Sequence, residues 1–203
     1  MRRLFVFALL SFPISAATIT DVAFGSHLAG GFVTVTFFGG PMATGTFAGP
    51  GTATFFSTFT LTVTPGTDTT LADWTLRNDD AGPLARSIVS VTFDLTLSSS
   101  LFDNDSLPST PGSGPGRSVA LFVAGAPIAS TTFVNPWPDP LNTGDLFRGA
   151  TVAFGGGGIA PGAVATFRLD TDTTAVPEPS LTPLVALVLV ALAKGRVKNW
   201  SCG

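Results

Sequence analysis

The chain has 203 residues, of which 45% are hydrophobic and only 11% are charged. This length fits one ordinary domain with short appendages, and the hydrophobic content excludes a disordered chain. Residues 18–176 carry twelve aspartates against five arginines, a net charge of −7. An acidic surface argues against nucleic acid as a partner.

The first 17 residues are typical of an export signal. Two arginines precede an apolar run over residues 4–12, and small residues two positions apart end at Ala17. Basic flank, short apolar segment and small residues in this order predict a signal helix with cleavage between Ala17 and Thr18. We expect the general secretory route, with twin-arginine export or a first buried element as alternatives. The only cysteine, Cys202, lies near the other end, so the body can have no internal disulfide.

The body between the two ends has the composition of a β protein. Threonine, valine and phenylalanine dominate, and lysine, glutamate and glutamine are missing over residues 21–176. The stretch "TFFSTFTLTVT" at 54–64 alternates apolar and threonine positions, as a half-buried strand does. "SIVSVTFDLTL" at 87–97 repeats the pattern, with Val91, Phe93 and Leu97 among its inward positions. Further candidate strands lie at 31–38, 71–78, 117–125, 130–134, 149–154 and 163–170.

Glycine and proline pairs separate these strands, for example Pro65-Gly66 and Pro161-Gly162. Short strands with polar outer faces and frequent turns favour antiparallel pairing. We therefore predict an all-β fold, an antiparallel β-sandwich of jelly-roll or Ig-like type, over residues 18–174. A closed barrel is the alternative, because periodicity alone does not distinguish sheet closure from two packed sheets.

Residues 175–198 combine three segments in a fixed order, and residues 199–203 follow as a tail. Pro177, Glu178 and Pro179 come first, and the prolines discourage both helix and sheet there. The thirteen residues 181–193 are apolar except for one threonine, and as a helix they would span about 20 Å of a hydrocarbon core about 30 Å thick. The positions expected to form this short membrane anchor are Leu181, Leu184, Val185, Leu187, Val188, Leu189, Val190 and Leu192, and the basic flank consists of Lys194, Arg196 and Lys198.

This order of segments resembles the PEP-CTERM sorting signal, over roughly the last thirty residues of the chain. In that family the signal marks exported bacterial proteins for an exosortase, a membrane-embedded transpeptidase related to cysteine proteases. The apolar stretch is shorter than the pattern, and "NWSCG" continues past the basic cluster. The resemblance implies an exosortase and, transiently, the bacterial inner membrane as partners, and extracellular polysaccharide as a possible one. A plain C-terminal transmembrane anchor is the alternative.

Candidate ligand sites in the body are few. Asp103 and Asp105 place carboxylates in an expected loop, where they could bind Ca²⁺ or simply form a turn. Trp137 in "NPWPDP" could stack on a sugar. His27 is the only histidine and the body has no cysteine and no glutamate, and we identify neither a Ser/His/Asp arrangement nor a zinc cluster in the sequence. No other cofactor is expected.

These features predict a non-catalytic protein rather than an enzyme. The leading interpretation is an exported protein of the cell surface or extracellular matrix, made as a membrane-anchored precursor and processed by an exosortase, as the resemblance implies. The alternative is a carbohydrate- or calcium-binding adhesion module.

Overall fold

The computed structural model describes residues 18–48, 58–64, 66–104, 110–138 and 144–175. Thr18–Ala175 form one compact unit. The described parts consist of strands and one 3-10 helix, η1 (Gly25–Leu28). None of their helices is long and apolar enough to cross a membrane. The expected signal helix and the expected apolar helix at 181–193 lie outside the described residues.

All strand pairs are antiparallel and fall into two sheets, which confirms the all-β, antiparallel prediction. The larger sheet has the order β1 (Thr18–Thr20), β12 (Thr171–Ala175), β7 (Ser100–Asp103), β10 (Leu146–Phe154), β6 (Ile88–Asp94), β2 (Phe32–Phe37) and β3 (Met42–Thr46), with β9 (Ile128–Pro136) paired to β10. The smaller sheet has the order β4 (Phe59–Val63), β5 (Trp74–Asn78), β11 (Val164–Arg168) and β8 (Leu121–Ala124).

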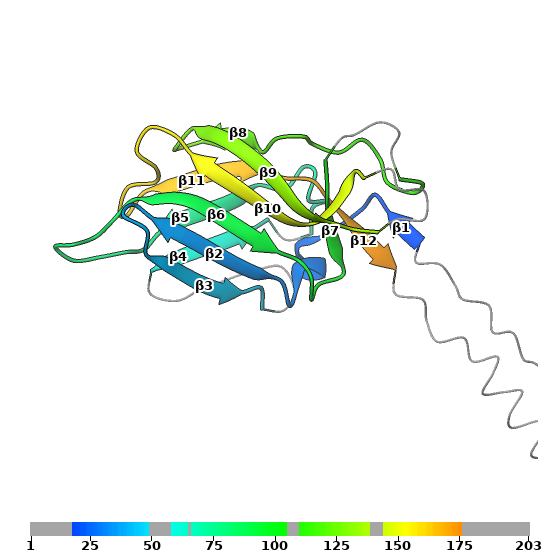
Figure 1. Cartoon of the computed structure of the whole chain (residues 1–203), viewed down its shortest axis with the longest axis horizontal. Coiled ribbons are helices and arrows are strands. Elements are labelled where there is room, and N and C mark those ends of the chain that lie inside the picture. The colour runs from blue at the N-terminus through cyan, green and yellow to red at the C-terminus, as the bar shows by residue number, and fades with distance from the viewer. Residues whose placement is uncertain (1–17, 49–57, 65, 105–109, 139–143, 176–203) are drawn as a thin grey trace, which may run out of the picture. The chain divides into compact units, whose positions relative to one another are not determined.

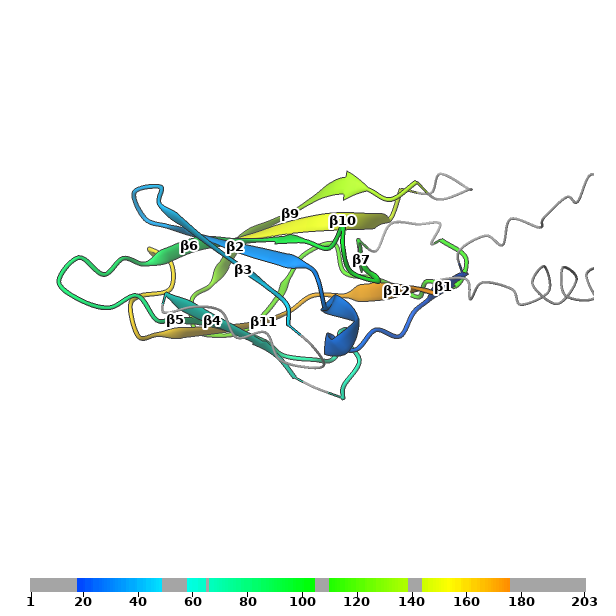
Figure 2. The same ribbon diagram turned by 90° about the horizontal axis from the view of Figure 1, so that it is seen from below.

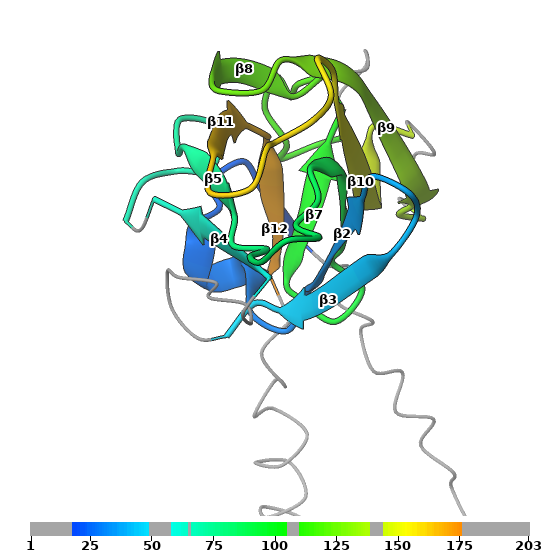
Figure 3. The same cartoon turned by 90° about the vertical axis from the view of Figure 1, so that its left-hand side faces the viewer.

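The two sheets lie over one another and enclose one main hydrophobic core (Figures 2 and 3). Alternation along the strands produces this arrangement, because Phe59, Leu61 and Val63 of β4 are buried while the threonines between them are half-buried. Outward threonines pair across strands, as in the hydroxyl contact of 3.0 Å between Thr92 and Thr151. The outer face is thus covered by short polar side chains that satisfy one another.

Trp74 lies at the centre of this core and touches both sheets. Its fully buried ring comes from the smaller sheet and meets Phe93 of the larger sheet edge-on, with the ring centroids 5.2 Å apart. Phe167 stacks against it from the neighbouring strand at 6.5 Å. Edge-to-face and offset aromatic pairs stabilise a core beyond the area that they bury. The contact of Trp74 with Phe93 therefore ties the sheets together.

The predicted strand at 87–97 is shorter than its pattern suggested. β6 ends at Asp94, and Leu97, expected to face inward, is 69% exposed, so that prediction was wrong. Asp94 Oδ1 accepts the Thr96 N–H at 2.9 Å, and the Ser98 hydroxyl donates to the Leu95 carbonyl at 3.0 Å. These local bonds compete with strand pairing and turn the chain away. After this turn the chain forms β7, which pairs with the first residues of β10.

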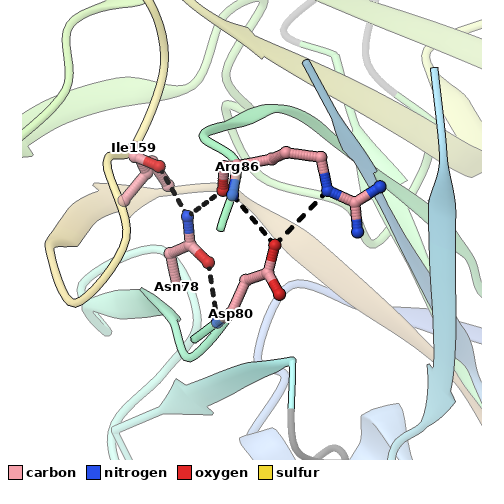
Figure 4. A network of polar contacts seen from close by, with 4 residues as sticks. All are labelled: Asn78, Asp80, Arg86 and Ile159. Atoms are coloured by element: carbon pink, nitrogen blue, oxygen red, sulfur yellow. Dashed lines mark hydrogen bonds and ion pairs between the residues drawn. The ribbon is translucent and has the colours of Figure 1, made fainter. Parts of the chain in front are cut away.

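A polar network joins the two sheets at the end of β5 (Figure 4). The buried side-chain amide of Asn78 donates to the carbonyls of Arg86 and Ile159, at 2.8 Å each. Its Oδ1 accepts the Asp80 N–H at 3.0 Å, and Asp80 in turn accepts the Arg86 N–H at 2.9 Å. Ile159 forms a bridge to Ile88, the first residue of β6. Asn78 therefore holds the last residue of β5 to the start of β6.

Replacing Asn78 by alanine should lower the free energy of unfolding by about 1 to 3 kcal/mol, because buried carbonyls lose their donor. Urea unfolding of the full chain in mild detergent, followed by tryptophan fluorescence, measures this change. Arg77→Ala is the matched control. The Arg77 side chain is exposed, so its ion pair with Asp79 should contribute less than about 1 kcal/mol to the free energy of unfolding. Equal losses in the two variants would contradict the role of the network.

Candidate functional site: a buried acidic cluster

β1, β12 and β7 pair at one end of the body (Figure 1). Four aspartates that lie in or next to these strands are close enough to affect one another electrostatically. We call Asp21, Asp103, Asp170 and Asp172 the acidic cluster. Asp21 directly follows β1 and is exposed, whereas the other three side chains are at most 1% exposed. Buried carboxylates are costly unless they are paired, hydrogen-bonded, protonated or bound to a cation. A group of three is therefore a candidate site.

Strand register explains why these carboxylates share one side of the sheet. Asp172 of β12 lies opposite Leu101 of β7, and Asp103, two residues further along β7, lies opposite Leu146 of β10. Paired residues and residues two apart lie on the same face of a sheet. Leu101 and Leu146 form a small second core with Ile19. The two buried carboxylates therefore line the same face as this second core.

Residues 110–117 pack against this face. The Thr110 N–H donates to Asp145 Oδ2 at 2.5 Å, which fixes the start of the segment. The Ser113 hydroxyl donates to Asp103 Oδ2 at 2.9 Å, and the Arg117 N–H donates to the Asp103 carbonyl at 3.1 Å. The segment is thus attached at both ends and in the middle. We call residues 110–117 the glycine cover, after its three glycines.

Two of these glycines lie close to carboxyl groups of the cluster. A Cβ on Gly114 would lie 2.4 Å from Asp21 Oδ1, and a Cβ on Gly116 would lie 2.2 Å from Asp103 Cγ. Any other residue at either position would push the carboxylate away. The main chain of the glycine cover therefore touches the carboxyl groups directly.

Asp172 is the least satisfied member of the cluster. Neither of its carboxylate oxygens has a hydrogen-bond partner among the described residues, because the nearby Ser113 hydroxyl donates to Asp103. Burial raises the pKa of Asp172 to about 8, and the carboxylates of the other three members add to this rise, while the nearby Ser113 hydroxyl opposes it although its hydrogen bond goes to Asp103. The site thus disfavours negative charge strongly at this carboxyl.

Asp170 is better supported. Burial raises its pKa to about 6, with a smaller upward contribution from Asp68 and Asp21, while the Thr70 hydroxyl and Arg117 lower it. Thr70 donates to Asp170 Oδ1 at 2.5 Å, and Arg117 Nη2 donates to the Thr70 carbonyl at 3.2 Å. The Arg117 guanidinium therefore supports Asp170, and it is not among the groups that affect the pKa of Asp172.

The structure places the sequence-predicted site residues as follows. Asp103 ends a buried strand instead of lying in an open loop, and Asp105 is outside the described residues. Trp137 is partly buried and packs against the second core. His27 accepts the Phe24 N–H through Nδ1 at 3.2 Å, a structural role in η1. The expected cleavage point after Ala17, the sorting motif, the apolar anchor and the basic flank involve residues outside the described ranges, apart from Thr18 in β1.

Sequence reasoning found Asp103 but missed its partners Asp170 and Asp172. The last candidate strand ended at Asp170, and the polar residues that follow it were not predicted as a strand, although the alternation of aspartate and threonine over 170–173 is a period of two. In the parts that the structure describes, no three His, Cys, Asp or Glu side chains are arranged so that they could hold a metal ion as they stand. Comparisons with family models, with curated proteins and with solved structures found no match to this chain.

The raised pKa values predict that stability falls as the pH rises. Between the ordinary aspartate pKa of 3.8 and the folded values of about 6 and about 8, the folded state binds more protons than the unfolded state. The stability contributed by these protons is complete below pH 3.8 and is lost as the pH rises through both folded values. Asp172→Asn keeps the shape of the protonated carboxyl and should flatten this decline.

Urea unfolding of the full chain in mild detergent with EDTA, measured from about pH 5 to about pH 8.5, tests this slope. Asp94→Asn is the control, since Asp94 lies on β6 outside the cluster and an asparagine can still accept the Thr96 N–H. A wild-type stability that does not change over this range would contradict the prediction.

Proposed function

We propose that this chain is an exported, non-catalytic protein of the bacterial cell surface or extracellular matrix, which an exosortase processes at its C-terminal tail. The resemblance of residues 177–198 to the PEP-CTERM signal supports the processing step, and the segment 1–17 supports export. Extracellular polysaccharide is the proposed surrounding of the mature protein.

The pairing of the first and last strands is the structural observation that supports this proposal best. Thr18 of β1 lies opposite Ala175 of β12, in a compact unit that contains only these residues and those between them. The expected signal cleavage falls directly before the first of them, and the expected sorting segment, residues 175–198, begins at the last. Removing either flank leaves every strand pair of the unit intact. Such a body suits a precursor that is cut at both ends.

The arrangement of the sheets supports a finer assignment of the body. Two antiparallel sheets of eight and four strands enclose the main core. We assign it to the β-sandwich class, of jelly-roll or Ig-like type. A sugar-binding role for Trp137 receives less support, because its ring packs against the second core. Calcium binding is favoured by a separate observation, the acidic cluster.

Replacing Glu178 by alanine should block processing while membrane association persists, because the apolar run 181–193 is unchanged. Immunoblots of membrane and medium fractions, in a host that carries an exosortase, follow both properties. Ser180→Ala is the control and should be processed normally. A Glu178→Ala protein that is processed like the wild type would leave only the plain-anchor interpretation.

Replacing Val188 by aspartate should act earlier, at insertion. A carboxylate near the centre of an apolar helix costs about 2.5 to 3.5 kcal/mol on insertion scales. The variant should therefore be lost from the membrane fraction, whereas Val188→Leu should be retained there. The proposal predicts that Glu178→Ala and Val188→Asp fail at different steps, and identical fractionation of the two variants argues against it.

A further inference from the structure

The acidic cluster has the features of a cation site that is built into the fold. Asp172 is completely buried, and both of its oxygens lack a hydrogen-bond partner among the described residues. It lies on the same face of the sheet as Asp103, and Asp21 stands at the exposed edge of the same group. A buried and unsatisfied carboxylate in a group of carboxylates needs either a proton or a cation.

The chemistry of the donors favours one class of cation. Every member of the cluster offers carboxylate oxygen, Ser113 adds a hydroxyl, and the only histidine and the only cysteine of the chain lie elsewhere in the sequence. Hard cations prefer oxygen ligands, and Ca²⁺ accepts flexible sets of mixed carboxylate, carbonyl and water oxygens. Mg²⁺ demands a stricter octahedron and keeps its water. Zn²⁺ and other softer metals prefer nitrogen and sulfur.

The glycine cover supplies the second half of the site. Gly114 approaches the Asp21 carboxylate and Gly116 approaches the Asp103 carboxylate so closely that a side chain at either position would displace the carboxylate. Main-chain carbonyls of such a segment can come near a bound ion where a larger residue would keep them away. Hydrogen bonds from Ser113 and Arg117 to Asp103 already hold the cover on the sheet.

We propose that Asp21, Asp103 and Asp172 bind one Ca²⁺ ion beneath the glycine cover, with the Ser113 hydroxyl as a supporting group. In the structure the described side chains do not converge as metal ligands do, so binding requires the carboxylates to turn toward one another. Like charges drive them apart, and a divalent cation between them reverses that force. Asp170, which Thr70 and Arg117 hold, supports the site from its inner side. This inference goes beyond the proposed function and does not depend on processing of the tail.

The test uses the full chain in mild detergent, stripped with EDTA and then titrated with CaCl₂ by calorimetry and thermal melting. We expect one Ca²⁺ per chain with a Kd of about 10⁻⁴ to 10⁻³ M, the range of extracellular modules. At a calcium concentration of about one hundred times Kd, Tm should rise by roughly 5 to 10 °C. MgCl₂ at equal ionic strength should produce a much smaller rise.

Two variants identify the site. Asp172→Asn should abolish the calcium-dependent rise in Tm, and Asp94→Asn, the same change outside the cluster, should retain it. Because Asp172 is buried, Asp21→Asn is the second variant, since an exposed carboxylate is not needed for folding. It should weaken calcium binding at least about tenfold. Absence of calcium binding to the wild type would overturn the proposal. It would also be overturned if Asp21→Asn binds calcium with unchanged affinity and Asp172→Asn either does not fold or keeps the calcium-dependent rise in Tm.

Discussion

The contact between Trp74 and Phe93 is the interaction on which the body of this protein depends. The two rings come from different sheets and meet edge-on at the centre of the main core. A body without an internal disulfide has no covalent link between its sheets, so burial of apolar surface must hold them together. The indole N–H of Trp74 has no hydrogen-bond partner among the described residues. This unpaired donor indicates that packing, and not polar bonding, fixes the ring in place.

The end of the body near β1 and β12 follows a different rule. There the second core is small, comprising Ile19, Leu101 and Leu146, and buried aspartates lie on the same face. Burial of these carboxylates opposes folding, whereas burial of Trp74 drives it. A fold therefore combines a strongly stabilised centre with a polar end whose stability depends on protons or on a cation. A site that is costly to keep without a ligand is a reason to look for a ligand there.

The sequence contained the information for the centre of the fold but not for this end. The period-two stretch 54–64 predicted a strand, and its described part contains β4, because an apolar and threonine alternation fits a half-buried strand. β12 was missed since its residues "TDTTA" are polar, and polarity normally indicates a loop. These residues are buried because β12 pairs with β1 and β7. Both strands are far from β12 in the sequence, so a local sequence pattern does not reveal the pairing. For the same reason Asp103 was predicted to lie in a loop, and its neighbour Asp172 was not predicted at all.

The acidic cluster and the expected sorting segment are close in the chain, which connects the two proposals. Asp172 lies in the same strand as Ala175, the first residue of that segment, and β12 also carries the pairing with β1. β1 has three residues, and β12 is the one strand of the described residues with which it pairs. The attachment of β1 to the sheet therefore depends on β12 keeping its strand conformation. A cation that joins Asp21, just after β1, to Asp172 in β12 would cross-link the two ends of the body. Calcium bound there would then stabilise the body by holding its first and last strands together.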